Sequence, residues 1–240
     1  GAVGTAHLLT PEQLNRKIEN VLHVSWGSYQ DPNLLNPGGG NGFKMLFGGI
    51  DSVDTTVRIQ DPNGIMANVI ERMSLEVGCE VIGSEFSLPQ AERVLFKNVE
   101  PTTEPLDANG YEIPEAAANI KANIVHLMST LWGETYAVTD PEVTRAFELY
   151  VQTWQEGKAL VNKDPEMGGL GTGFACGGNF TSNNYLTGVP FGPAAEGDKS
   201  PHIAWRGDGE GGVNDPLYTG RAWMAVMVYL LSDATFVYDL

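Results

Sequence analysis

The sequence predicts a mainly α-helical fold with long irregular loops rich in glycine, proline and asparagine. Apolar residues recur at helical spacing in several segments, and most of these segments open at a capping residue or a proline. The stretches between them have a composition that cannot sustain a helix or a central strand. With 240 residues and 42% hydrophobic content, the chain can bury a substantial core.

The first helix is predicted to open at Thr10, which can cap it. Pro11 suits the first helical position, and Gln13 completes a capping box. Apolar residues between positions 14 and 22 then fall on one face. A second amphipathic helix is predicted over residues 61–79, where apolar residues recur at spacing four.

Residues 88–96 are expected to form a short helix, followed by a connector rich in proline and glutamate at residues 97–114. A third long helix is expected to begin near Pro114, and a fourth opens at the Asp-Pro step of residues 140–141. Gly157 is the expected stop of the fourth helix, because glycine is common just after the last helical residue.

The character of the chain changes in its C-terminal third. Residues 168–220 are rich in Gly, Asn, Ser, Pro and Asp, and we interpret them as a long irregular segment that is either functional or held by its neighbours. The sequence therefore divides into a helical part, residues 1–167, and a second part, residues 168–240, that ends in an apolar helix. We expect both parts to pack on the same core.

The closing stretch contains the uninterrupted apolar run Ala222–Leu231. This run is about half as long as the ~20 residues that a bilayer-spanning helix needs, so we expect no transmembrane segment. It is apolar on every side, and such a helix belongs either in the middle of a core or against another subunit. The side chains that we predict to contact a partner are Trp223, Met224, Val226, Met227, Tyr229 and Leu230.

The composition limits the classes of partner. Lys and Arg number 14 against 30 Asp and Glu, which gives a formal net charge of −16. Such a chain repels phosphate backbones and anionic lipid headgroups, so nucleic-acid binding is not expected. The acidity fits a protein that meets basic partners or metal cations, but an ordinary well-solvated surface is the default interpretation.

One acidic loop is a weak calcium candidate. Asp208, Glu210, Asn214 and Asp215 lie close together among glycines, and oxygen-rich loops of this kind can wrap calcium. The spacing does not match the helix–loop–helix calcium pattern, so a solvated acidic loop is the default interpretation. No other cofactor is predicted. The sequence has no Cys-x-x-Cys-His, which excludes covalent haem attachment in this chain.

The two cysteines, Cys79 and Cys176, match no zinc or redox motif. Their separation allows one long-range disulfide, and two unpaired cysteines are the equal alternative. The start of the sequence has no initiator Met, no basic n-region and no apolar h-region, so we expect a processed or trimmed chain.

The common catalytic signatures do not occur. The sequence contains no Gly-x-Ser-x-Gly elbow, no His-Glu-x-x-His and no Gly-x-x-x-x-Gly-Lys. His126 is interpreted as a core or helix-surface histidine. Carboxylate pairs such as Glu100 with Glu104, or Glu80 with Glu85, could serve acid/base chemistry. Among thirty acidic residues, however, such proximity carries little weight by itself.

Several quoted segments resemble a group of known proteins. "LLTPEQLNRKIENVL", "LFGGIDSVDTTVRIQDPNGIMANVIERMSLEVGC", "AAANIKANIVHLMSTLWGE" and "YTGRAWMAVMVYLLSDATFVYDL" together resemble uncharacterised secreted bacterial proteins, some of which accompany or contain c-type cytochrome domains. The resemblance implies export and proximity to electron-transfer proteins, and it supplies no catalytic residue. The missing haem motif is a departure from any cytochrome.

The leading functional expectation is a non-catalytic, exported subunit or scaffold of a larger assembly, located in the periplasm or outside the cell. Its partners are expected to be other protein subunits, further copies of itself or a cytochrome. The first alternative is an accessory protein of an exported electron-transfer system that docks a cytochrome or holds a cofactor. The second alternative is a hydrolase that uses a carboxylate pair.

Overall fold

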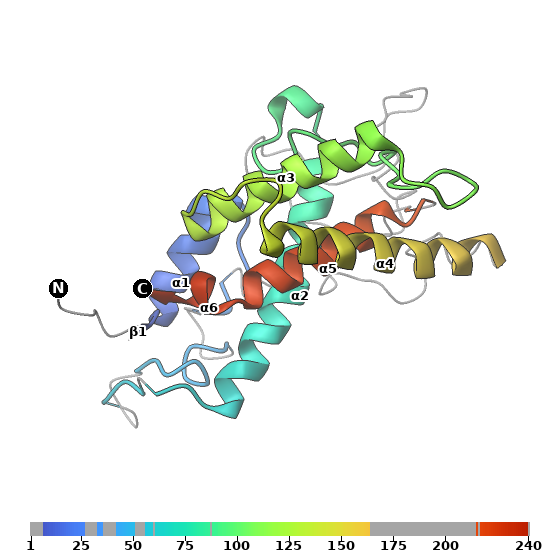
Figure 1. The fold of residues 1–240 in the computed structure, drawn as a ribbon. Helices are drawn as coiled ribbons and strands as arrows, with labels where there is room; N and C mark the ends of the chain where they lie inside the picture. The colour runs from blue at the N-terminus through green and yellow to red at the C-terminus, as the bar shows by residue number, and fades with distance from the viewer. Residues whose placement is uncertain are drawn as a thin grey trace.

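The computed structural model describes residues 7–26, 33–35, 42–50, 56–59, 61–86, 88–163, 215 and 217–239 (Figure 1). This part of the chain is mainly α-helical, as the sequence predicts. Its elements, in chain order, are β1 (His7–Leu8), α1 (Pro11–Lys17), the π-helix η1 (Ile18–Leu22), α2 (Gly64–Phe86), the 3-10 helix η2 (Gln90–Glu92), α3 (Pro114–Trp132), α4 (Pro141–Lys163), α5 (Thr219–Ser232), α6 (Ala234–Val237) and β2 (Tyr238–Asp239).

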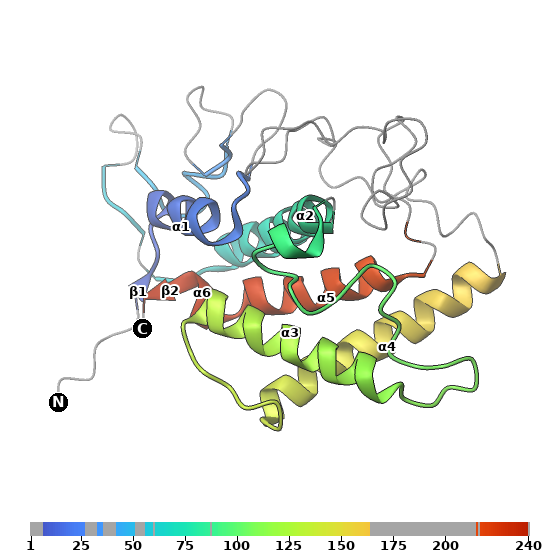
Figure 2. The ribbon, with the colours of Figure 1, turned by 90° about the horizontal axis from the view of Figure 1, so that it is seen from above.

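Helix α5 lies at the centre of the fold although it is the last long helix of the chain. It packs against α2 on one side and α4 on the other, and Figure 2 shows it running between them. Trp223 is fully buried, with its ring 4.7 Å from that of Tyr150 and 5.2 Å from that of Phe96. The apolar residues of α5 belong to the same hydrophobic core as those of α1 to α4.

The composition of α5, which is apolar on every side, allows two environments: the core of its own chain or a contact with another subunit. The burial of its side chains shows which of the two applies. Of the six side chains predicted to contact a partner, five are buried within this chain: Trp223, Met224, Val226, Met227 and Leu230. The sixth, Tyr229, is half-buried and donates its hydroxyl hydrogen to Glu142. The apolar surface of α5 therefore packs against helices of its own chain, and a contact surface for another subunit has to be sought elsewhere.

The two ends of the described chain are held together. Strands β1 and β2 pair in antiparallel fashion, with His7 opposite Asp239. Lys17 of α1 donates to the backbone oxygen of Phe236 at 2.7 Å and lies over its ring at 4.5 Å. The N-terminal helix thus closes over the C-terminal turn, a contact between distant positions that no local pattern indicates.

The predicted helix starts are largely confirmed. Thr10 and Gln13 form the predicted reciprocal capping box, and Pro11 is the first residue of α1. Helix α2 begins after Asn63, whose side-chain oxygen accepts hydrogen bonds from the amides of Ile65 and Met66. It then runs to Phe86, beyond the predicted end at residue 79.

Two local predictions are wrong for reasons that lie in tertiary contacts. Residues 88–96 contain only the short helix η2, because the carboxylate of Glu85 accepts the amides of residues 94–96 that a helix would use. Gly157 does not stop α4, which continues to Lys163. A Cβ atom at Gly157 would lie 1.9 Å from the ring of Tyr218. The absence of a side chain at Gly157 therefore lets this ring lie directly against α4.

In the described ranges, no helix combines the length and the apolar composition required to cross a membrane.

The contact between α2 and α5 is tight at Gly78, where a Cβ atom would lie 3.2 Å from the Cβ of Met227. We expect Gly78→Leu to lower the free energy of unfolding by about 1–3 kcal/mol, because the larger side chain forces the two helices apart. Urea denaturation followed by circular dichroism measures the change. The matched control is Gly64→Ala, where no atom lies within 4 Å of the new methyl group. Equal stability of the Gly78→Leu variant and the wild type would contradict the packing described above.

Candidate functional site

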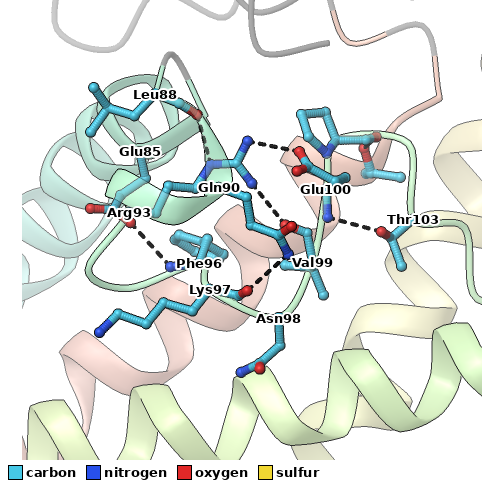
Figure 3. Close-up of polar contacts among 12 residues, drawn as sticks. Glu85, Leu88, Gln90, Arg93, Phe96, Lys97, Asn98, Val99, Glu100 and Thr103 are labelled. Carbon is cyan, nitrogen blue, oxygen red and sulfur yellow. Dashed lines mark hydrogen bonds and ion pairs between the residues drawn. The ribbon is translucent and has the colours of Figure 1, made fainter.

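The segment between α2 and α3 begins with a loop that is held by buried charge. We call residues 88–105 the central loop. Glu85, at the end of α2, is only 2% exposed, and its carboxylate accepts hydrogen bonds from the backbone amides of Val94, Leu95 and Phe96 at 3.2, 2.8 and 3.0 Å. Figure 3 shows the bond to Phe96. A buried carboxylate is costly unless it is fully hydrogen-bonded, so Glu85 fixes the course of the loop.

Arg93 is the second buried charge of the central loop. Its guanidinium donates to the carbonyl oxygens of Leu88 and Val99 at 2.9 and 2.8 Å, and to the carboxylate of Glu100 at 2.7 Å (Figure 3). It also lies 5.1 Å from the centre of the Phe86 ring. The side chain is thus surrounded by groups that satisfy it, and it ties both ends of the loop together.

Helices α3, α4 and α5 also hold the central loop. His126 of α3 lies 2.7 Å from the backbone oxygen of Val94, and Lys158 of α4 forms an ion pair with Glu104 at 2.9 Å. The hydroxyl of Thr219, at the start of α5, donates to the backbone oxygen of Pro101. The central loop is therefore held by side chains of α2, α3, α4 and α5.

A hairpin continues from the central loop. We call residues 105–113 the hairpin. The amide of Asp107 donates to the oxygen of Tyr111 at 2.8 Å, and Ile113 donates to Pro105 at 2.9 Å. The carboxylate of Asp107 accepts from the amides of Asn109 and Tyr111 at 2.8 and 2.9 Å. These bonds give a short stretch of chain a defined shape.

The hairpin projects into solvent beyond the N-terminal end of α3 (Figures 1 and 2). Its root is covered, because Pro105 is buried and Leu106 packs on the core. Beyond the root, Tyr111 is 73% exposed and Ile113 is 36% exposed. The hairpin thus holds an aromatic and an aliphatic side chain in water on an ordered backbone.

A second exposed apolar surface lies near the start of α2. Its side chains are Leu46, Val57, Ile59 and Ile65, and we call this surface the apolar end. A Cβ atom at Gly48 would lie 2.6 Å from the backbone oxygen of Ile59 and 2.8 Å from the side chain of Met66. The segments that carry the four exposed side chains therefore meet in space.

Cations flank the apolar end. Lys44 and Arg58 both form ion pairs with Glu12, at 3.3 and 3.1 Å. Burial acts to raise the pKa of Glu12, but hydrogen bonds from the backbone, Arg58 and Lys44 outweigh it and lower the pKa. These two ion pairs join the segments that carry Lys44 and Arg58 to α1, which carries Glu12.

The calcium candidates are only partly described. Asp215 is 1% exposed; its carboxylate accepts from the amides of Gly220 and Arg221 at 3.1 and 3.0 Å and pairs with the Arg221 guanidinium at 3.2 Å. Burial raises the pKa of Asp215, while the bonds to Arg221 and Gly220 act in the opposite direction. These oxygens cap α5. The other three candidates, Asp208, Glu210 and Asn214, lie outside the described residues.

The carboxylates considered as acid/base pairs have other partners. Glu100 binds Arg93, Glu104 binds Lys158, and Glu85 binds backbone amides. Within the described ranges, no group of three or more His, Cys, Asp or Glu side chains could hold a metal ion. Cys79 is buried on α2, and no cysteine of the described residues is free. Cys176 lies outside these residues, so the pairing of the two cysteines stays a prediction.

Comparisons with protein-family models, with curated protein sequences and with solved structures found no match to this chain.

Sequence reasoning missed both exposed surfaces. The hairpin had a signal, since Asp107, Asn109 and Gly110 are typical turn residues, but the connector was interpreted from its overall composition. The apolar end had no local signal, because its side chains come from segments separated along the chain and become one surface only after folding.

Arg93 should be far more important for stability than an exposed arginine. We expect Arg93→Met to lower the free energy of unfolding by about 3 kcal/mol, because the buried acceptors of Arg93 lose their donor. The control is Arg72→Met, which removes an ion pair to Glu76 from a side chain that is 57% exposed, and it should cost less than about 1 kcal/mol. Thermal and urea unfolding measure both. Equal losses would show that the fold does not depend on the central loop.

Asp107 should control the local order of the hairpin. The amide of Tyr111, followed by that of Asn109, lowers the pKa of Asp107 from its ordinary value of 3.8. A lowered pKa in the folded state stabilises the hairpin above pH ~4, and this contribution is lost as the pH falls through the folded-state pKa. The amide NMR signal of Tyr111 should therefore titrate with a midpoint below 3.8.

The Asp107→Ala variant should abolish this titration and speed hydrogen exchange at Tyr111 about tenfold, which is the loss of about one hydrogen bond. Glu112→Ala is the matched control, because the carboxylate of Glu112 has no hydrogen bond or ion pair with the described residues. A hairpin whose Tyr111 exchange is the same in both variants would contradict the role of Asp107.

Proposed function

We propose that the protein is a non-catalytic, exported subunit or scaffold of a larger protein assembly. The apolar end is the observation that carries the proposal. Most soluble chains keep large apolar side chains apart on their surface, whereas a contiguous exposed group is typical of a contact with another protein. Leu46, Val57, Ile59 and Ile65 lie on three segments that meet near Gly48, and three of these side chains are at least half exposed.

Three buried charged side chains that bind the backbone support the same proposal. Glu85, Arg93 and Asp215 are almost fully buried, and each of them binds backbone groups that fix a loop or a helix start. These charges act as structural supports for a defined shape. A subunit of an assembly needs such a shape, because partners that meet preformed surfaces lose less conformational entropy on binding.

Export is supported by the state of the described cysteine. No cysteine of the described residues is a free thiol, which agrees with the export that the resemblance of the quoted segments implies. Disulfides persist in oxidising compartments such as the periplasm and the extracellular space.

The proposal predicts a native particle much heavier than the 25.9 kDa chain. Light scattering after size exclusion, on protein isolated from its source, measures the mass. The double variant Val57→Ser, Ile59→Ser should reduce the particle toward the mass of a single chain, because each lost apolar side chain removes about 1–2 kcal/mol of contact energy. Val138→Ser is the control, since Val138 is 52% exposed outside the apolar end.

A native particle with the mass of one chain, with or without these substitutions, would contradict the proposal. Unfolding curves of the variants should match the wild type, because the substituted side chains are exposed. A loss of assembly accompanied by a loss of folding would not count in its favour.

A further inference from the structure

We propose that Asn109, in the hairpin, is a site of spontaneous covalent modification, at which the chain converts its own asparagine to aspartate or isoaspartate. The sequence has three Asn-Gly steps, at residues 41–42, 63–64 and 109–110. A glycine after asparagine favours this reaction, because no side chain hinders the approach of its backbone nitrogen. Residue 41 lies outside the described residues, so the structure compares Asn63 with Asn109.

The reaction needs nothing from outside the chain except water. The backbone nitrogen of Gly110 attacks the side-chain carbonyl carbon Cγ of Asn109 and forms a new C–N bond. The bond between Cγ and the side-chain nitrogen breaks, and that nitrogen leaves as ammonia with the hydrogen of the Gly110 amide. Water then opens the resulting cyclic imide at one of its two carbonyl carbons. One opening gives aspartate, and the other gives isoaspartate, whose main chain runs through Cβ and Cγ.

The hairpin leaves both reacting groups accessible. Asn109 and Gly110 are exposed to water. No described residue donates a hydrogen bond to the side-chain oxygen of Asn109. Gly110 has a φ of +83°, and a Cβ atom built on it would meet no atom within 4 Å. The attacking nitrogen can therefore move toward Cγ without displacing packed atoms, and intramolecular attack is fast when the two groups can meet.

Asn63 has the same following residue, but the start of α2 holds it. Its side-chain oxygen accepts hydrogen bonds from the amides of Ile65 and Met66, both at 3.0 Å. Its backbone oxygen accepts from the amide of Ala67 at 3.1 Å. Closing the imide ring would turn both the side chain of Asn63 and its peptide bond to Gly64, which breaks these bonds of the first helical turn. Asn63 should therefore react much more slowly than Asn109, although it is also exposed.

Asp107 restrains the reacting segment of the hairpin. Its backbone oxygen accepts the hydrogen of the attacking Gly110 amide at 3.0 Å. Its carboxylate accepts from the amides of Asn109 and Tyr111 at 2.8 and 2.9 Å. These bonds keep the Gly110 nitrogen in the turn conformation. Because no helix continues the turn, fewer bonds have to break here than at Asn63, and removing the Asp107 side chain should speed the reaction.

The modification changes the surface that carries Tyr111. Aspartate at position 109 adds a negative charge close to the carboxylate of Asp107. Isoaspartate lengthens the main chain by one carbon atom and displaces the amides that bind this carboxylate. The amide of Tyr111 should therefore exchange its hydrogen faster in the isoaspartate form than in the unmodified chain.

The experiment incubates the purified full-length chain in mildly alkaline buffer, where loss of the proton from the Gly110 amide speeds the attack. Peptide mapping by mass spectrometry follows the loss of each side-chain amide with time, and chromatography separates isoaspartate from aspartate. In the folded chain, Asn109 should convert at least ~10-fold faster than Asn63, because more hydrogen bonds have to break at Asn63. In the chain unfolded by urea, the two rates should become similar.

Three variants test the roles of single residues. Asn109→Gln keeps the side-chain amide but should not convert measurably, because the imide would need a larger ring. Asp107→Ala should speed conversion at Asn109 about tenfold, which is the loss of about one hydrogen bond. Glu112→Ala, which removes another carboxylate of the same hairpin, should leave the rate unchanged. The rate at Asn63 reports whether each variant keeps the folded start of α2.

Two results would overturn the inference. If Asn109 in the folded chain converts no faster than Asn63, the hairpin does not favour the reaction. If the difference between the two sites stays the same in urea, it arises from the neighbouring residues in sequence and the fold has no part in it. A rate at Asn109 that does not change in Asp107→Ala would contradict the restraint by Asp107.

Discussion

Two opposite charges, Glu85 at the end of α2 and Arg93 in the central loop, are buried against the backbone of that loop, and the arrangement of the helices depends on them. Each is almost completely removed from water and bound by backbone groups of the central loop. Such charges tolerate few alternative conformations, because any shift leaves a buried group without a partner. The loop therefore behaves as a rigid element, on which α3, α4 and α5 each place a side-chain contact.

The central position of α5 has consequences for the whole chain. Helices α2 and α4 are far apart in sequence. Both pack against α5, a helix near the C-terminal end of the chain. The core is thus completed only when the last segment is in place. Glycine supports this packing at two points, since Gly78 lets α5 approach α2 and Gly157 lets the ring of Tyr218 lie on α4.

The central loop, α1 and α2 together explain why the exposed surfaces have fixed positions. The hairpin grows out of the central loop, so its root is as constrained as the loop itself. The apolar end is anchored through Met66 of α2 and through the ion pairs to Glu12 of α1. If the backbone that carries exposed apolar side chains were mobile, ordering it on binding would offset much of the contact energy. Here folding has already ordered that backbone.

The sequence by itself determined the elements whose causes are local. Helical spacing, the capping box at Thr10 and Pro114 at the start of α3 depend on residues within a few positions of each other. The tertiary structure alone decided that the apolar run of α5 packs inside its own chain, that residues 88–96 stay largely irregular, and that α4 continues through Gly157. Each of these depends on an atom brought from a distant part of the chain or from a neighbouring element. A pattern of neighbouring residues contains no information about such an atom.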